Sequence, residues 1–144
     1  MSKPTRPMAL TPFIGAWHTT GATRATADEP SQQIEAVDIY EWMDGGFFIL
    51  HRIESKKPMA FTGLEIIGSE DGGYFLHHYD SNGTRIVSTG KMQGREWRID
   101  SKTERFAGTI SEDGQTITGA WERSTDGENW GAWMDITLRR SRPG

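Results

Sequence analysis

Three side chains in the first half of the chain could do chemistry together: Asp38, Tyr40 and His51. An aspartate that hydrogen-bonds to a histidine can orient the imidazole as a general acid or base, and a neighbouring tyrosine can donate a hydrogen bond. The same residue types also form an ordinary structural group, in which a buried Asp–His pair satisfies its own hydrogen bonds. The sequence leaves both interpretations open, because these residues specify no substrate.

All three residues fall on one face of a predicted hairpin, YEWMDGGFFILHR, at residues 40–52 and the residues just before it. A two-residue turn at Asp44-Gly45 pairs Asp38 with His51, Tyr40 with Ile49 and Trp42 with Phe47. A turn at Gly45-Gly46 shifts these pairs by two residues and keeps the same face. This face is more aromatic and less charged than the other, so we expect it to point inward; it holds Asp38, Tyr40, Trp42, Phe47, Ile49, His51 and Ile53.

The following strands should continue this inner face. A turn at Lys56-Lys57 extends it to Ala60, Thr62, Leu64 and Ile66. Glu65 then points to solvent, whereas the opposite register would make it a buried carboxylate opposite His77 or His78, with an acid/base role. His77 and His78 are neighbours in a strand, so one points in and the other out, and the length of the turn at Asp71-Gly72 decides which.

The last two hairpins complete the expected lining. Phe106 should lie opposite Trp121, and Trp121 opposite Ala132, which brings Met134, Ile136 and Leu138 to the same face. We therefore expect a cavity lined by Tyr40, Trp42, Ile49, His51, Leu64, His78, Trp121 and Met134. Any catalytic role would fall to His51, Asp38 and Tyr40.

Metal and cofactor motifs are missing from the sequence. His77-His78 with Asp80 is a weak metal pattern, because adjacent strand residues point to opposite faces. His18 and His51 lie elsewhere, and neither an HxH nor an HExxH spacing occurs. No Gly-x-Ser-x-Gly motif and no phosphate-binding loop is found. We expect no metal and no cofactor.

Turn signals such as Asn82-Gly83 and Asp113-Gly114 recur along the chain and separate runs of β-branched and aromatic residues. They predict about ten strands, at residues 14–24, 33–43, 47–55, 59–68, 74–80, 84–92, 96–102, 105–111, 116–123 and 130–140. Such a meander closes most simply into an all-β, up-and-down antiparallel barrel, and an open sandwich is the alternative. We expect residues 13–140 to form this barrel, residues 1–12 a flexible N-terminal tail and residues 141–144 a C-terminal tail.

Composition excludes several classes of function. The 144 residues carry a net charge of −4 with no basic cluster, which argues against nucleic-acid binding. There is no membrane-length apolar run and no secretory signal, so we expect a cytoplasmic protein. The lack of Cys excludes disulfides, thiolate catalysis and Cys-type metal sites. The outer face of the first hairpin is apolar and includes Val37, Ile39, Phe48 and Leu50. We expect another part of the chain or a second subunit to cover it, for example in a homodimer.

Several segments together resemble a known class of barrels. FIGAWHTTG at residues 13–21 has the Gly-x-Trp opening of the calycins, which include lipocalins and fatty-acid-binding proteins. With GLEIIGSEDGGY and the segment from Arg105 to Arg140, the hairpin resembles a bacterial family of uncharacterised lipocalin-like barrel proteins. The resemblance implies that Trp17 packs beneath Arg139 or Arg140 at the barrel floor. The chain is also similar in outline to the haem-binding nitrobindins, but residues 79–144 contain no His to hold the iron.

Three functions follow as hypotheses. The first is binding of an apolar or aromatic small molecule in the lumen. The second is a cofactor-independent isomerase, cyclase or lyase that uses His51 as acid/base in the same cavity. The third is a haem or metal carrier that uses one of the four His.

Overall fold

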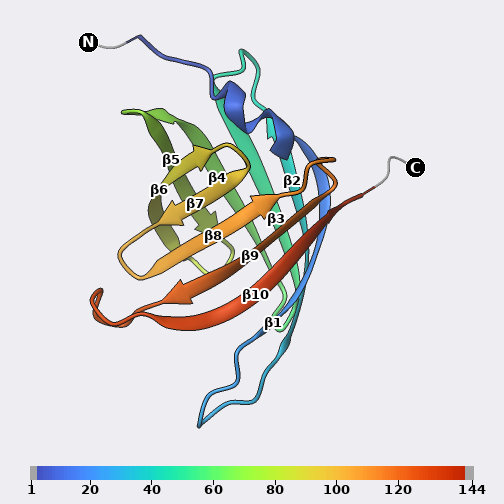
Figure 1. Cartoon of the computed structure of the whole chain (residues 1–144), viewed down its shortest axis with the longest axis vertical. Coiled ribbons are helices and arrows are strands. Elements are labelled where there is room, and N and C mark those ends of the chain that lie inside the picture. The colour runs from blue at the N-terminus through green and yellow to red at the C-terminus, as the bar shows by residue number, and fades with distance from the viewer. Residues whose placement is uncertain (1–2, 142–144) are drawn as a thin grey trace.

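The chain folds into a closed barrel of ten antiparallel strands (Figure 1). A computed structural model describes residues 3–141. The strands are β1 (Gly15–Thr23), β2 (Gln33–Trp42), β3 (Phe48–Lys57), β4 (Phe61–Glu70), β5 (Gly73–Asp80), β6 (Arg85–Gln93), β7 (Glu96–Asp100), β8 (Glu104–Ile110), β9 (Thr116–Arg123) and β10 (Gly131–Arg140). Each strand pairs with its neighbours in the chain, and β1 pairs with β10 to close the ring. The predicted all-β, up-and-down barrel is therefore confirmed.

The β2–β3 hairpin adopts the second of the two expected registers. Trp42 lies opposite Ile49, and Tyr40 opposite His51, so the pairs expected from a turn at Asp44-Gly45 are wrong by two residues. The connection is a four-residue loop, residues 44–47, in which Gly45 and Gly46 have positive φ. Because the shift is two residues, the inward face of both strands is unchanged.

The β3–β4 hairpin differs from the expectation. The last paired residues are Ser55 and Phe61, so an odd number of residues separates them instead of the two assumed for the Lys56-Lys57 turn. A change of one residue in loop length exchanges the faces of the next strand. The inward residues of β4 are consequently Phe61, Gly63, Glu65 and Ile67, and the expectation that Ala60, Thr62, Leu64 and Ile66 point inward is wrong.

The β4–β5 turn is the two-residue turn at Asp71-Gly72, with Glu70 paired to Gly73. Because β4 already carries the exchanged face, this turn places His78 opposite Glu65 on the inside and leaves His77 on the outside. The Phe106–Trp121 pair is as predicted, but a β-bulge in β10 puts Met134, not Ala132, opposite Trp121.

One end of the barrel is closed by a short 3₁₀ helix, η1 (Met8–Phe13) (Figure 1). Its Leu10 and Phe13 are 1% and 4% exposed and belong to the hydrophobic core. The expected flexible tail of residues 1–12 is thus packed against the barrel from Pro7, which is also fully buried. Residues 142–144 of the expected C-terminal tail lie outside the described residues, as do residues 1–2.

Trp17 and Arg140 hold η1 against this end of the barrel. The Arg140 guanidinium lies 4.2 Å from the centre of the fully buried Trp17 ring. It donates hydrogen bonds to the carbonyl oxygens of Pro12 and Ile14 at 2.6 and 2.7 Å. Of the two expected arginines, Arg140 therefore makes the stacking contact.

No helix among the described residues has the length and apolar character needed to cross a membrane.

Candidate ligand-binding site

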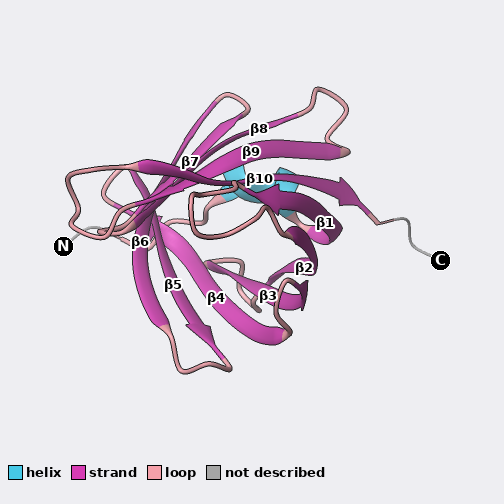
Figure 2. Cartoon of the chain, turned by 90° about the horizontal axis from the view of Figure 1, so that it is seen from below, coloured by secondary structure: helices cyan, strands magenta, loops and turns pink. Residues whose placement is uncertain are grey.

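The barrel encloses a cavity of about 640 Å³, to which all ten strands contribute side chains. This volume falls within the range of roughly 300–1,000 Å³ typical of small-molecule sites. Leu10 and Phe13 of η1 form its floor, and Figure 2 views the barrel from the opposite end. We call that opposite end the loop end; the loop residues Thr26, Glu29, Pro58 and Met59 border the cavity there.

Most of the cavity wall is apolar or aromatic. Trp97 and Phe106 are each about nineteen-twentieths buried, and Phe13 packs against both Tyr40 and Trp97 with ring centroids 5.6 and 5.4 Å apart. The remaining apolar and aromatic lining residues include Ile49, Ile67, Leu76, Ile99, Ile117, Trp121, Met134, Ile136 and Leu138.

A polar cluster interrupts this wall near the floor. His51 on β3 lies between two carboxylates of the neighbouring strands: its Nε2 is 2.7 Å from Oδ1 of Asp38, and its Nδ1 is 3.0 Å from Oε1 of Glu65. The Thr19 hydroxyl on β1 donates to the other oxygen of Asp38. Four adjacent strands thus deliver one side chain each, and we call Thr19, Asp38, His51 and Glu65 the lumen cluster.

The hydrogen bonds of the lumen cluster determine the protonation of His51. A neutral imidazole has only one N–H, whereas both ring nitrogens here face a carboxylate oxygen, so the doubly protonated ring satisfies both bonds. Burial alone would lower the pKa of His51, but the hydrogen bonds and negative charges of Asp38 and Glu65 outweigh it and raise the pKa to about 9. His51 is therefore an imidazolium at neutral pH.

Tyr40 covers the cluster. Its ring is stacked on the His51 ring, with centroids 3.9 Å apart. Burial, followed by the charges of Asp38 and Glu65, raises the pKa of Tyr40 well above 10, so the phenol keeps its proton. Among residues 3–141 its hydroxyl makes no hydrogen bond, and since no fully buried polar side-chain atom there lacks a partner, the hydroxyl is open to the cavity.

A second polar group lies towards the loop end. His78 Nε2 is 3.0 Å from Oδ2 of Asp80, whose other oxygen accepts from the backbone N–H groups of Asn82 and Thr84. Glu104 also lines the cavity, and burial raises its pKa against the opposing charges of His78 and Arg123. Asp80 is thus committed to holding the β5–β6 turn and His78.

The structure brings together most of the residues that the sequence singled out. Tyr40, Ile49, His51, His78, Trp121 and Met134 line the cavity, together with Asp38. Trp42 packs against the core without lining the cavity. Glu65 was expected on the outside and lies inside. The sequence analysis missed Thr19 and Trp97, because it had not assigned an inner face to the strands that hold them.

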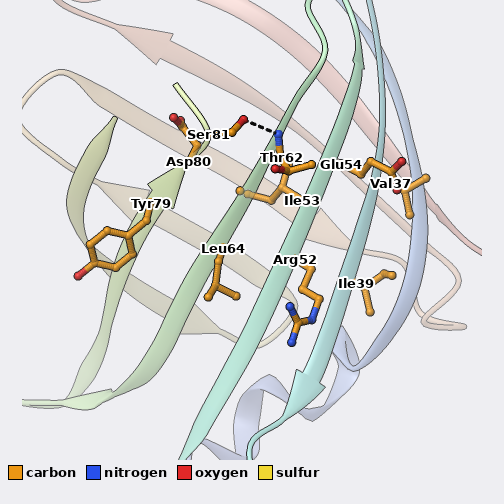
Figure 3. A pocket seen from close by; sticks show the side chains of 11 residues that line it. Val37, Ile39, Arg52, Ile53, Glu54, Thr62, Leu64, Tyr79, Asp80 and Ser81 are labelled. Atoms are coloured by element: carbon orange, nitrogen blue, oxygen red, sulfur yellow. Dashed lines mark hydrogen bonds between the residues drawn. The ribbon is translucent and has the colours of Figure 1, made fainter. Parts of the chain in front are cut away.

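Leu64 lies on the outside of the barrel, where it borders a shallow groove with Val37, Ile39, Arg52 and Tyr79 (Figure 3). Here Ser81 accepts a hydrogen bond from the Thr62 backbone N–H at 3.0 Å. Ile39 and Phe48 of the outer face are 38% and 39% exposed. The expected homodimer through this face stays a prediction.

Across residues 3–141, no three His, Asp or Glu side chains are grouped so that they could hold a metal ion. The ring nitrogens of His51 are both committed to carboxylates, and Nε2 of His78 is committed to Asp80.

The closed ten-stranded antiparallel barrel with its internal cavity fits a lipocalin-like fold. Among solved structures the chain is similar to Rv2717c from M. tuberculosis, with a TM-score of 0.70 over 94% of this chain and 96% of that one. The two sequences are 14% identical, so the likeness concerns the fold alone. No protein-family model matches the chain, and no curated protein matches it.

Proposed function

We propose that this protein binds an apolar or aromatic small molecule in the barrel lumen. The observation that carries the proposal is the cavity of about 640 Å³ itself, which has an apolar and aromatic wall and a few convergent polar groups. Burying a small apolar molecule there would remove its surface from water at a gain of about 25 cal/mol per Å². The polar groups would then orient it. We expect the protein to act in the cytoplasm.

Catalysis by His51 is less well supported than binding. A general base needs an unprotonated nitrogen within reach of the substrate. With a pKa of about 9 and both N–H groups directed at Asp38 and Glu65, His51 has no free nitrogen at neutral pH. A haem or metal carrier that used His51 would need the same nitrogens, so the hydrogen bonds of the cluster favour a structural and recognition role for this residue.

The test compares two tryptophan variants on one strand. Ser88 on β6 points into the cavity, and the neighbouring Thr89 is exposed on the outside. Ser88→Trp should fill part of the lumen, while Thr89→Trp adds the same atoms outside. Both variants and the parent protein would be titrated with the neutral fluorescent probe N-phenyl-1-naphthylamine.

We expect Ser88→Trp to weaken binding of the probe by about tenfold or more, because a bulky ring takes the volume that the probe needs, and Thr89→Trp to leave it unchanged. Equal affinities in both variants would mean that the probe binds outside the lumen. Native mass spectrometry of the purified protein would identify any retained compound, and its Soret absorbance would reveal haem.

A further inference from the structure

The lumen cluster carries a net negative charge beside the cavity floor. Two carboxylates, Asp38 and Glu65, face a single imidazolium, and the three side chains are only 9–14% exposed. In so buried a place the surplus charge is poorly screened, and another charge nearby interacts with it much more strongly than in water. An anionic group brought next to the cluster would be repelled, whereas a cationic group would be attracted.

The hydrogen bonds of the cluster leave one charged position unfilled. Asp38 uses one oxygen for His51 and the other for Thr19, and His51 uses both nitrogens. Glu65 uses only Oε1; its Oε2 makes no hydrogen bond to any residue in the described part of the chain, where no fully buried side-chain oxygen lacks a partner. Glu65 Oε2 is therefore an acceptor that faces the cavity.

The Tyr40 hydroxyl is the second unfilled polar group on this wall. Tyr40 is stacked on His51, directly beside Asp38 and Glu65. A hydroxyl can accept one hydrogen bond and donate another. Glu65 Oε2 and Tyr40 Oη together suit a ligand group that carries N–H or O–H hydrogens.

No Lys or Arg among the described residues that line the cavity lies near the floor, where it could receive an anion. Among the described residues that line the cavity, the Lys and Arg side chains are Arg24, Lys57 and Arg123. Lys57 and Arg123 are the last residues of β3 and β9, and Arg24 follows β1, so all three lie at the loop end. Arg24 is moreover paired with Asp135 at 2.7 Å.

We propose that the lumen selects its ligand by charge: it takes an apolar or aromatic molecule with an ammonium, or more weakly a hydroxyl, end group that donates to Glu65 Oε2, and it rejects the matching carboxylate. This inference rests on the proposed lumen binding and adds the chemical class of the ligand. An ammonium is preferred because a hydrogen bond between two charged groups is stronger than one with a neutral partner.

The test uses three ligands with one skeleton: 1-naphthylmethylamine, 1-naphthylmethanol and 1-naphthoate. Each would compete with N-phenyl-1-naphthylamine for the parent protein at pH 7. We expect the amine to bind about tenfold or more tightly than the carboxylate, with the alcohol between them, as for the loss of one charge-assisted hydrogen bond. A carboxylate that binds as tightly as the amine would overturn the charge selection and leave lumen binding intact.

Glu65→Gln provides the matched variant, because it removes the charge and keeps the shape. The preference for the amine over the alcohol should disappear in Glu65→Gln and persist in Glu104→Gln, which neutralises another lumen carboxylate at the loop end. If Glu104→Gln removes the preference and Glu65→Gln does not, the assignment to Glu65 is wrong. Failure of the neutral probe to bind the parent protein would instead reject the proposed function, and this inference with it.

Discussion

The rings of Tyr40 and His51 are stacked almost parallel, with an angle of 11° between their planes and their centroids 3.9 Å apart. The two residues are direct partners across β2 and β3, so the pairing of the strands produces the stack. Because His51 is protonated, the contact places a cation on the face of a phenol ring, an interaction worth about 0.5–2 kcal/mol. The stack and the two carboxylates together fix the His51 ring and leave the Tyr40 hydroxyl at the surface of the cavity.

Replacing His51 should destabilise the fold strongly. His51→Gln would leave Asp38 and Glu65 as buried carboxylates without a cation between them, and breaking a buried charge pair in this way costs about 3–5 kcal/mol. Urea unfolding would measure the loss. His77→Gln makes the same substitution on the outside of β5; it is the control and should cost less than about 1 kcal/mol. Similar losses in the two variants would contradict the role assigned to the cluster.

Stability should depend on pH through His51. Its pKa is about 9 in the folded protein and close to 6.5 in the unfolded chain, so the folded state binds the proton more tightly. The resulting stabilisation, about 3 kcal/mol, is complete below pH 6.5 and is lost as the pH rises through 9. Urea unfolding at several values between pH 6 and 9.5 would show this fall. The free energy of unfolding of His51→Gln should change much less over the same range; an equal slope would assign the titration to another group.

Removing the Arg140 guanidinium should loosen the barrel floor. Arg140 stacks on Trp17 and donates to backbone carbonyls of Pro12, Ile14 and Gly114, so it joins η1, β10 and the β8–β9 turn. Arg140→Lys keeps the charge and loses the planar set of donors, and we expect it to cost about 1–3 kcal/mol. Arg139→Lys changes the preceding, exposed residue in the same way and should leave the free energy of unfolding nearly unchanged. Hydrogen exchange of the Ile14 and Trp17 amides would show whether the floor opens first.

The strand order and the first inner face could be predicted because both depend on local signals. Asn-Gly and Asp-Gly turns marked the hairpins, and the glycines at 83 and 114 have the positive φ that such turns require. The inner face of β2 and β3 was predicted correctly even from the wrong turn at Asp44-Gly45. The true register differs by two residues, and side chains alternate with a period of two.

The sequence could not show whether a loop contains an odd or an even number of residues. GLEIIG reads equally well with Leu64 or Glu65 inside, and the loop at residues 56–60 decides between them through the number of its residues. This single ambiguity hid Glu65, and with it the second partner of His51. Leu10 and Phe13 were missed for another reason: a short segment with a proline has no periodicity, and only packing against the finished barrel buries its side chains.

Gly21 marks a place where β1 and β10 approach too closely for any side chain. A Cβ atom there would overlap the backbone carbonyl of Asp135, which is held in the β1–β10 ladder and has no freedom to move aside. Glycine inside a strand weakens it, so its presence here reflects this close approach. We expect Gly21→Ala to cost about 2–3 kcal/mol, as overpacking does elsewhere. Gly131→Ala at the exposed start of β10, where a Cβ would have no neighbour within 4 Å, should stay within about 0.5 kcal/mol. Thermal unfolding of the two alanine variants gives the comparison, and a Gly21→Ala protein as stable as Gly131→Ala would show that the seam closing the barrel can widen at no cost.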